Sequence, residues 1–149
     1  MWVALIAIII LFFDQLTKFL VNKNLTLHQS IPIIHKVLHI TVVHNRGAAF
    51  GIFRNQTLLF ILTSILAISL ILFNLKRDAG RKSILYNFSL ALILGGALGN
   101  LVDRLFLGYV VDFLDFRIWP VFNLADSAIT AGALGLGYIL VKSEHKDKN

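Results

Sequence analysis

"TLLFILTSILAISLILFNL", residues 57–75, holds no charged residue and is long enough for a helix to cross a bilayer, which takes about 20 residues. The rest of the chain has the same character. Of its 149 residues, 57% are hydrophobic and 15% are charged, whereas soluble domains carry roughly 25% charged residues. The length is that of one domain. We therefore expect one polytopic membrane domain over residues 1–149.

Three further stretches are long and apolar enough to span a membrane. The expected spans are residues 2–21, 57–75, 84–105 and 122–141. The first stands where a signal peptide would, but it has no basic start and no A-x-A-like cleavage site, and it carries Asp14 and Lys18. We expect it to be a retained helix. The predicted fold is an all-α integral membrane protein with four transmembrane helices.

Lysine and arginine are distributed unevenly between the connecting segments. Segments 76–83 and 142–149 hold seven of them in 16 residues, whereas segments 22–56 and 106–121 hold five in 51. Cytoplasmic loops carry the excess of Lys and Arg, so both termini are expected in the cytoplasm and the two longer loops outside. Topology thus explains the net charge of +6, and no nucleic-acid partner is expected.

The first outer loop contains a strand signal. Residues 36–53, "KVLHITVVHNRGAAFGIF", alternate and are rich in β-branched residues, with a turn signal at Asn45–Gly47. We expect a small extracytoplasmic β-structure there that packs on the helix ends. Close packing between the helices themselves is indicated by small residues four apart, Gly95 with Gly99 and Ala128 with Gly132.

Five of the eight acidic residues fall on the outer side in this topology: Asp14, Asp103, Asp112, Asp115 and Asp126. Ionisable residues in or beside a membrane are costly and usually functional. The convergence of five carboxylates on one face of a small apolar protein is therefore the main chemical signal in the sequence.

Most of these acids also have a structural interpretation. Asp14 and Lys18 are four apart and can pair within one helix, with Lys18 snorkelling outward. Asn100, Asp103 and Arg104 share a helical face and could form an interfacial polar cluster. Asn123 and Asp126 have the spacing of a capping box. Asp115 is interpreted as structural, whereas Asp112 between Val111 and Phe113 is harder to explain in this way.

Two facing carboxylates can act as an acid–base pair, because like charges at short range keep one proton between them. Asp126 at a helix N-terminus is favoured as the ionised member. Asp112 between apolar neighbours is favoured as the protonated member. The residues alone leave Asp103 as a competing partner for Asp126.

Other chemistries fit less well. The chain has no cysteine, so a thiolate nucleophile is excluded. None of the five histidines lies in an expected span and no H-E-x-x-H motif occurs, so we expect no metal site. The serines in the spans lack a membrane histidine to activate them. A small proton- or cation-coupled transporter remains an alternative, although its acids would be expected near the bilayer midplane.

Five motifs together resemble the lipoprotein signal peptidases, the signal peptidase II family of aspartic peptidases. In chain order they are "DQLTK" (14–18), "NRGAAFG" (45–51), "GGALGNLVDR" (95–104), "VVDF" (110–113) and "FNLADS" (122–127). The resemblance covers nearly the whole chain. It implies a bacterial inner-membrane enzyme, with its active site near the outer face. Such an enzyme removes signal peptides from prolipoproteins on the N-terminal side of a diacylglyceryl-modified cysteine.

The resemblance also assigns residues. It implies that Asp112 and Asp126 are the catalytic pair, which decides against Asp103, and that adjacent Arg104 would hold Asp103 ionised. Arg104 and Asn45 would touch the substrate backbone, and Gly47 would let the turn come close. The residues expected to support the site or bind substrate are Asp14, Lys18, Asn45, Gly47, Asn100, Asp103, Arg104, Asn123 and Ala125. We expect no cofactor, and as partners prolipoproteins and membrane lipids, with the chain acting as a monomer.

Overall fold

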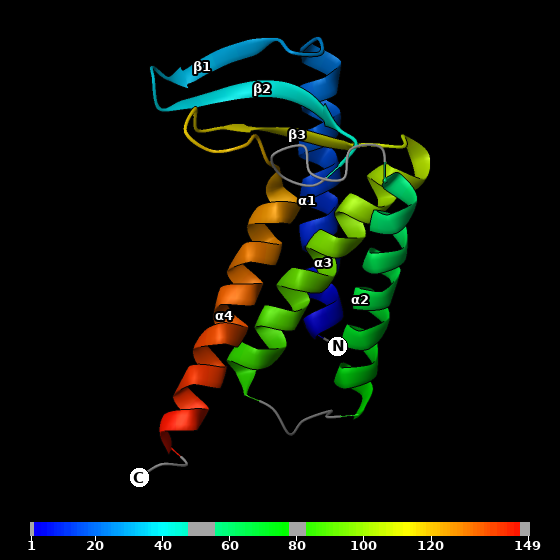
Figure 1. Cartoon of the computed structure of the whole chain (residues 1–149), viewed down its shortest axis with the longest axis vertical. Helices are drawn as coiled ribbons and strands as arrows, with labels where there is room; N and C mark the ends of the chain where they lie inside the picture. The colour runs from blue at the N-terminus through cyan, green and yellow to red at the C-terminus, as the bar shows by residue number, and fades with distance from the viewer. Residues whose placement is uncertain (1, 48–55, 78–82, 147–149) are drawn as a thin grey trace.

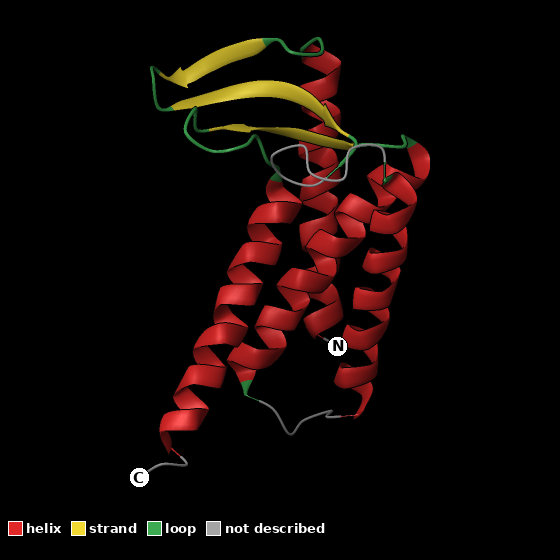
Figure 2. Ribbon diagram, in the orientation of Figure 1, coloured by secondary structure: helices red, strands yellow, loops and turns green. Residues whose placement is uncertain are grey.

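The computed structural model describes residues 2–47, 56–77 and 83–146, and within them the chain forms four long helices and a small sheet (Figures 1 and 2). The helices are α1 (Trp2–Asn24), α2 (Thr57–Arg77), α3 (Ile84–Phe106) and α4 (Leu124–Lys146). The strands are β1 (Ser30–Ile34), β2 (Leu38–Asn45) and β3 (Val110–Asp115). The helices form a bundle with the sheet across one end, and both termini lie toward the other end (Figure 1).

The four predicted spans are confirmed. Each contains a helix long and apolar enough to cross a membrane. The fourth helix begins at Leu124 rather than at residue 122, because Asn123 caps it instead of joining it. The chain is therefore a multi-pass membrane protein by the length and composition of its helices.

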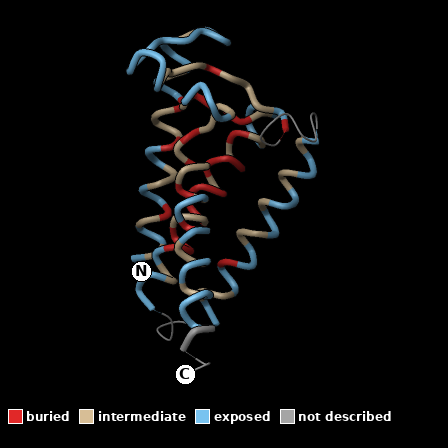
Figure 3. Tube along the Cα trace, turned by 60° about the vertical axis from the view of Figure 1, so that its left-hand side comes forward, coloured by how far each residue is buried: buried red, intermediate tan, exposed pale blue. Residues whose placement is uncertain are grey.

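Helix α3 lies at the centre of the bundle and packs on the other three helices. The predicted contacts between small residues are confirmed. A Cβ added at Gly95 would lie 2.7 Å from the Ala7 carbonyl oxygen of α1, and one added at Gly132 would lie 2.6 Å from the Ser89 carbonyl oxygen. Glycine is required at these positions because the backbones approach so closely. Buried residues accordingly gather between the helices (Figure 3).

The sheet corrects the prediction that the β-structure belongs to the first loop alone. In the described part of the chain its strand order is β1-β2-β3, and both pairs are antiparallel. β2 lies inside the predicted segment 36–53, whose last six residues are outside the described part. β1 precedes that segment, and β3 comes from the connection between α3 and α4, because the bundle brings these two connections to the same end.

β3 places Asp112 in regular structure, where the sequence predicted a loop. Asp112 is paired with Val43 of β2, and the register is irregular between Ile40 and Val43. Such bulges bend a strand and re-aim its side chains. The chain then turns back, because Phe122 pairs with Leu114, and it enters α4 directly.

Candidate functional site

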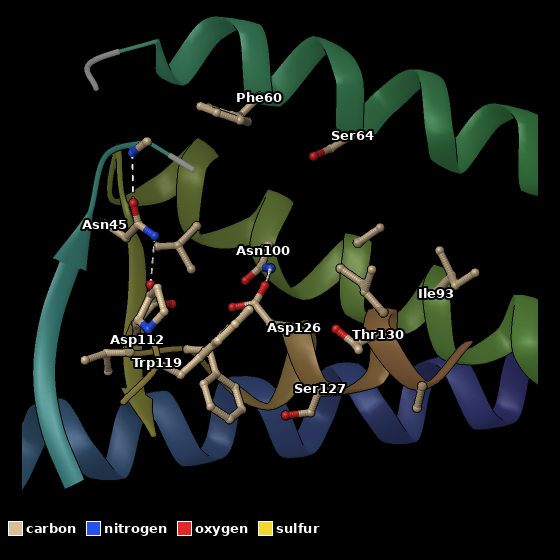
Figure 4. Close-up of a pocket in the computed structure, with 18 of the residues that line it drawn as sticks. Asn45, Phe60, Ser64, Ile93, Asn100, Asp112, Trp119, Asp126, Ser127 and Thr130 are labelled. Atoms are coloured by element: carbon tan, nitrogen blue, oxygen red, sulfur yellow. Dashed lines mark hydrogen bonds between the residues drawn. The ribbon is translucent and has the colours of Figure 1, made fainter. Parts of the chain in front are cut away.

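A cavity of about 980 Å³ opens beside the sheet and runs along the bundle. Its polar end is formed by side chains from β2, β3 and the sheet-proximal ends of α3 and α4 (Figure 4). These polar lining residues are Asn45, Asn100, Arg104, Asp112 and Asp126. The rest is mostly apolar and is lined by α2, α3, α4 and the segment 116–122.

Asp112 is buried at the polar end, with 1% of its surface exposed. Its Oδ1 accepts a hydrogen bond from Asn123 Nδ2 at 2.7 Å, and its Oδ2 accepts one from Asn45 Nδ2 at 2.8 Å. Burial, followed by the neighbouring charge of Asp126, raises the pKa of Asp112 to about 7, although the two amide donors oppose this shift. Asp112 is therefore able to carry a proton near neutral pH.

Asp126 lies in the first turn of α4 and lines the same cavity. Its Oδ1 accepts a hydrogen bond from Asn100 Nδ2 at 2.7 Å, and its Oδ2 accepts one from the Asn123 amide at 3.3 Å. Asn123 Oδ1 in turn accepts from the Asp126 amide at 2.9 Å. The predicted capping box is thus present. Both oxygens of this carboxylate therefore accept a hydrogen bond at the first turn of the helix.

Each of the three asparagines has its orientation fixed by a second bond. Asn45 Oδ1 accepts from the Gly47 amide at 2.9 Å, which turns Nδ2 toward Asp112. Asn123 Oδ1 caps α4, which leaves its Nδ2 for Asp112. Asn100 Oδ1 accepts from Asn123 Nδ2 at 3.1 Å, so its own Nδ2 points to Asp126. Asn123 therefore connects the two carboxylates.

Behind the carboxylates lies a buried ion group that corrects the prediction for Lys18. Lys18 does not snorkel outward, because it is 3% exposed and its Nζ lies 2.8 Å from Asp14 Oδ2 and 3.0 Å from Asp103 Oδ2. Lys18 is thus in direct contact with Asp103, and the charge of Arg104 interacts with Asp103 as well. The lysine is buried because α1 and α3 pack closely and offer it acceptors that replace water.

The remaining predicted residues, Arg104, Gly47 and Ala125, also lie at or beside the cavity. Arg104 lines the cavity, its Nη1 donates to the Asn100 carbonyl at 3.4 Å, and its guanidinium lies 5.0 Å from the centroid of the Phe60 ring. Gly47 lines the cavity beside Asn45. Ala125 is fully buried against α3, where a Cβ at Gly99 would come within 3.4 Å of its side chain. All nine predicted supporting residues are thus gathered at this end of the bundle.

Two carboxylates that line one cavity, one of them with its pKa raised to about 7, have the chemistry that acid–base catalysis needs. Asp112 lies in β3 and Asp126 in the first turn of α4, so both lie at the sheet end of the bundle (Figure 1). This position disfavours the transporter alternative, whose acids are expected near the bilayer midplane.

The family model described as signal peptidase (SPase) II matches residues 6–142, nearly the whole chain. The chain belongs to the signal peptidase II family. This membership makes the chain a peptidase of a bacterial membrane.

Relatives in this family match over almost their full length. A lipoprotein signal peptidase of Halothermothrix orenii is 50% identical, over 88% of this chain and 89% of its own. One from Caldanaerobacter subterraneus is 51% identical, over 89% and 90%. A solved bacterial membrane enzyme superposes with a TM-score of 0.90 at 33% identity, over 95% of this chain and 88% of that one.

Sequence reasoning did not single out Gln15, a polar residue next to the candidate site. Gln15 Nε2 donates to Asp103 Oδ1 at 2.9 Å and to the Gly99 carbonyl at 3.2 Å, so it joins α1 to α3. Its place in "DQLTK", between two ionisable residues on an apolar helix, was the available signal. It was overlooked because an uncharged amide in a span has no distinctive pattern.

Proposed function

We propose that the chain is an aspartic lipoprotein signal peptidase that uses Asp112, Asp126 and an activated water. Its substrate would be a prolipoprotein, cleaved on the N-terminal side of a diacylglyceryl-modified cysteine. The observation that carries the proposal is that both carboxylates line one cavity and that each accepts a hydrogen bond from Asn123, Asp112 from its side chain and Asp126 from its backbone amide. Asp103 is the weaker partner for Asp126, because it is absent from the cavity lining and is bound to Lys18 and Gln15.

The environments of the two carboxylates favour distinct roles. Ionised Asp126 takes a proton from water as the water oxygen attacks the scissile carbonyl carbon, and protonated Asp112 gives its proton to the carbonyl oxygen. In the collapse of the tetrahedral intermediate, Asp126 gives its proton to the leaving amine and Asp112 recovers one from a hydroxyl group. The pair returns to its starting state without a cofactor.

The shape of the cavity suits a substrate that arrives through lipid. Its apolar part is lined by residues of α2 and α4, among them Phe60, Ala67, Ile129 and Leu134. Acyl chains and an apolar signal peptide can be accommodated there, and their binding energy would hold the scissile bond against the dyad. Arg104 and Asn45 line the same cavity and would hydrogen-bond the substrate backbone.

The proposed placement in the membrane puts both termini in the cytoplasm and the sheet, with the active site, at the outer face. The basic residues at the end of α2, Lys76 and Arg77, support this orientation. The proposed enzyme works as a monomer.

The test compares a diacylglyceryl-modified prolipoprotein with its unlipidated twin, using purified protein in nanodiscs. We expect only the lipidated substrate to be cleaved, and expect Asp112→Asn and Asp126→Asn each to lose at least about 10³-fold in kcat. Asp115→Asn is the matched control, because Asp115 lies in the same strand but binds Thr41 and Arg117. It should retain activity within a few-fold.

Cleavage that persists in the two folded asparagine variants would reject the dyad. Equal cleavage of both substrates would reject the proposed substrate class. Proper folding of the variants is checked by size-exclusion chromatography and thermal unfolding.

A further inference from the structure

Two backbone amides beside the dyad are held by buried carboxylates. The Ala125 amide donates to Asp14 Oδ1 at 2.9 Å, and the Val111 amide donates to Asp103 Oδ2 at 3.0 Å. Ala125 immediately precedes Asp126, and Val111 immediately precedes Asp112. Each member of the dyad therefore follows a backbone position that is fixed by a carboxylate from α1 or α3.

One ammonium group joins these two carboxylates. Lys18 Nζ lies 2.8 Å from Asp14 and 3.0 Å from Asp103, and the exposed fractions of the three side chains are 3%, 0% and 3%. Buried carboxylates need a compensating charge, and removal of one partner from a buried ion group leaves the other charges uncompensated. Lys18 thus connects the segment that carries Asp126 to the segment that carries Asp112.

The uncharged side chain of Gln15 joins the same two carboxylates as the Lys18 ammonium. Gln15 Nε2 donates to Asp103 Oδ1 at 2.9 Å and to Asp14 Oδ2 at 3.2 Å. Lys18 also donates to Asn100 Oδ1 at 3.1 Å, and Asn100 binds Asp126. Lys18 itself is absent from the cavity lining, so it does not touch the cavity and reaches the dyad through these hydrogen bonds and through the field of its charge on Asp112.

We propose that Lys18 is a positioning residue that sets the separation of the two dyad carboxylates. Its charge draws Asp14 and Asp103 together, and these two carboxylates hold the backbone immediately before Asp126 and Asp112. Small displacements of reacting groups strongly reduce catalysis, whereas binding in the apolar cavity is left unchanged. The inference rests on the proposed function of the dyad.

The first experiment replaces Lys18 by methionine, which keeps the chain length and removes the charge. We expect Lys18→Met to lower kcat at least 100-fold, with KM within about threefold of wild type, when rates are normalised to the folded fraction. The matched control is Thr17→Val. Among the described residues the Thr17 hydroxyl bonds only to carbonyls of its own helix, Phe13 and Asp14, so this variant should stay within about twofold in kcat.

The second experiment separates positioning from a merely structural role. Lys18→Met combined with Asp14→Asn removes one negative charge together with the positive one, and the asparagine oxygen can still accept from the Ala125 amide. We expect this double variant to recover at least fivefold in kcat over Lys18→Met. A crystal structure of Lys18→Met should show a changed Asp112–Asp126 separation.

Three results would overturn the inference: an unchanged kcat in folded Lys18→Met, a loss confined to KM, or a double variant no faster than the single one. The double variant decides the matter if the single variant aggregates. Failure of wild type to cleave would count against the proposed function. Cleavage by wild type with full kcat in Lys18→Met would count against this inference alone.

Discussion

Helices α2 and α3 are both apolar and span-length, yet they occupy opposite environments. Of the 21 residues of α2, only Ile71 is buried, whereas 11 of the 23 residues of α3 are buried, including Asn100 and Asp103. Helix α2, which is uncharged up to its last two residues, leaves most of its surface exposed for lipid. The helix with polar residues and glycines is central, because those groups need protein partners and close approach. The more apolar helix, α2, therefore lies at the periphery of this membrane protein, and α3, with its polar residues, lies inside and lines the candidate site.

The largest expected effect on kcat comes from replacing Asn123, which lies between the two carboxylates. Asn123→Ala removes the donor to Asp112 Oδ1 and the acceptor for the Asp126 amide. We expect kcat to fall about 10²–10³-fold, the typical effect of losing one preorganised donor, and stability to fall by about 1 kcal/mol through the lost cap. Both are measured with the lipidated substrate and by thermal unfolding.

The control for Asn123→Ala is Asn74→Ala in α2, whose side chain, within the part of the chain that the structure describes, bonds only to the Leu70 carbonyl of its own helix. It should leave kcat unchanged within about twofold. A similar loss of kcat in both variants would contradict the difference between α2 and the polar interior around α3.

A smaller effect is expected from closing the contact between α1 and α3. A Cβ at Gly99 would press on the Asp14 carboxylate, so Gly99→Ala must displace the group that holds Ala125. We expect a destabilisation of about 1–3 kcal/mol, as for overpacked cores, together with reduced kcat. Leu66→Ala in α2 is the contrast, because Leu66 is 59% exposed to the surroundings. Equal destabilisation of the two variants, measured by unfolding in detergent, would contradict the comparison.

The pH dependence of kcat tests whether Asp112 in the polar interior carries the proton. Asp112 must carry a proton to act as the acid, and its pKa is raised to about 7, so activity is expected below that pH and is lost as pH rises through it. The hydrogen bond from Asn45 lowers this pKa, so Asn45→Ala should move the alkaline limb of kcat to higher pH.

The control for the pH profile is Thr41→Ala in the same strand, because Thr41 binds Asp115 and not Asp112. Thr41→Ala should leave the alkaline limb of the kcat profile at the same pH as in the wild type. A limb that moves to lower pH in Asn45→Ala would contradict the assignment of the proton to Asp112.

The smallest expected effect concerns Phe60 of α2, whose ring lies against the Arg104 guanidinium. Phe60→Leu removes the ring that faces Arg104 at 5.0 Å. A cation–π contact of about 0.5–1 kcal/mol corresponds to a change of roughly two- to fivefold in kcat/KM. Phe73→Leu, at a 61% exposed position of the same helix, is the control. A loss larger than tenfold in Phe60→Leu would show that α2 contributes more to the site than its packing suggests.

Local sequence signals predicted those parts of the fold that depend on neighbouring residues. The spans followed from apolar length, and the Asn123–Asp126 box from a spacing of three. The glycine contacts of α3 followed from small residues four apart. Such features need no knowledge of distant residues. The resemblance to a family then selected Asp112 over Asp103, a choice that the residues alone had left open.

The features that the sequence could not predict connect residues far apart in the chain. β3 pairs with a strand some 70 residues away, so its short apolar run looked like a loop. The buried state of Lys18 was missed for the same reason, since its acceptors Asp103 and Asn100 lie on another helix.

The sequence by itself determined that the chain crosses the membrane with four helices and that a carboxylate opens the fourth, because apolar length and helix capping are local physics. Only the tertiary structure decided which groups surround the two carboxylates and raised the pKa of Asp112. Burial and the field of a neighbouring charge depend on how four helices and a sheet meet, and Asp112 acquires its raised pKa only when they do so.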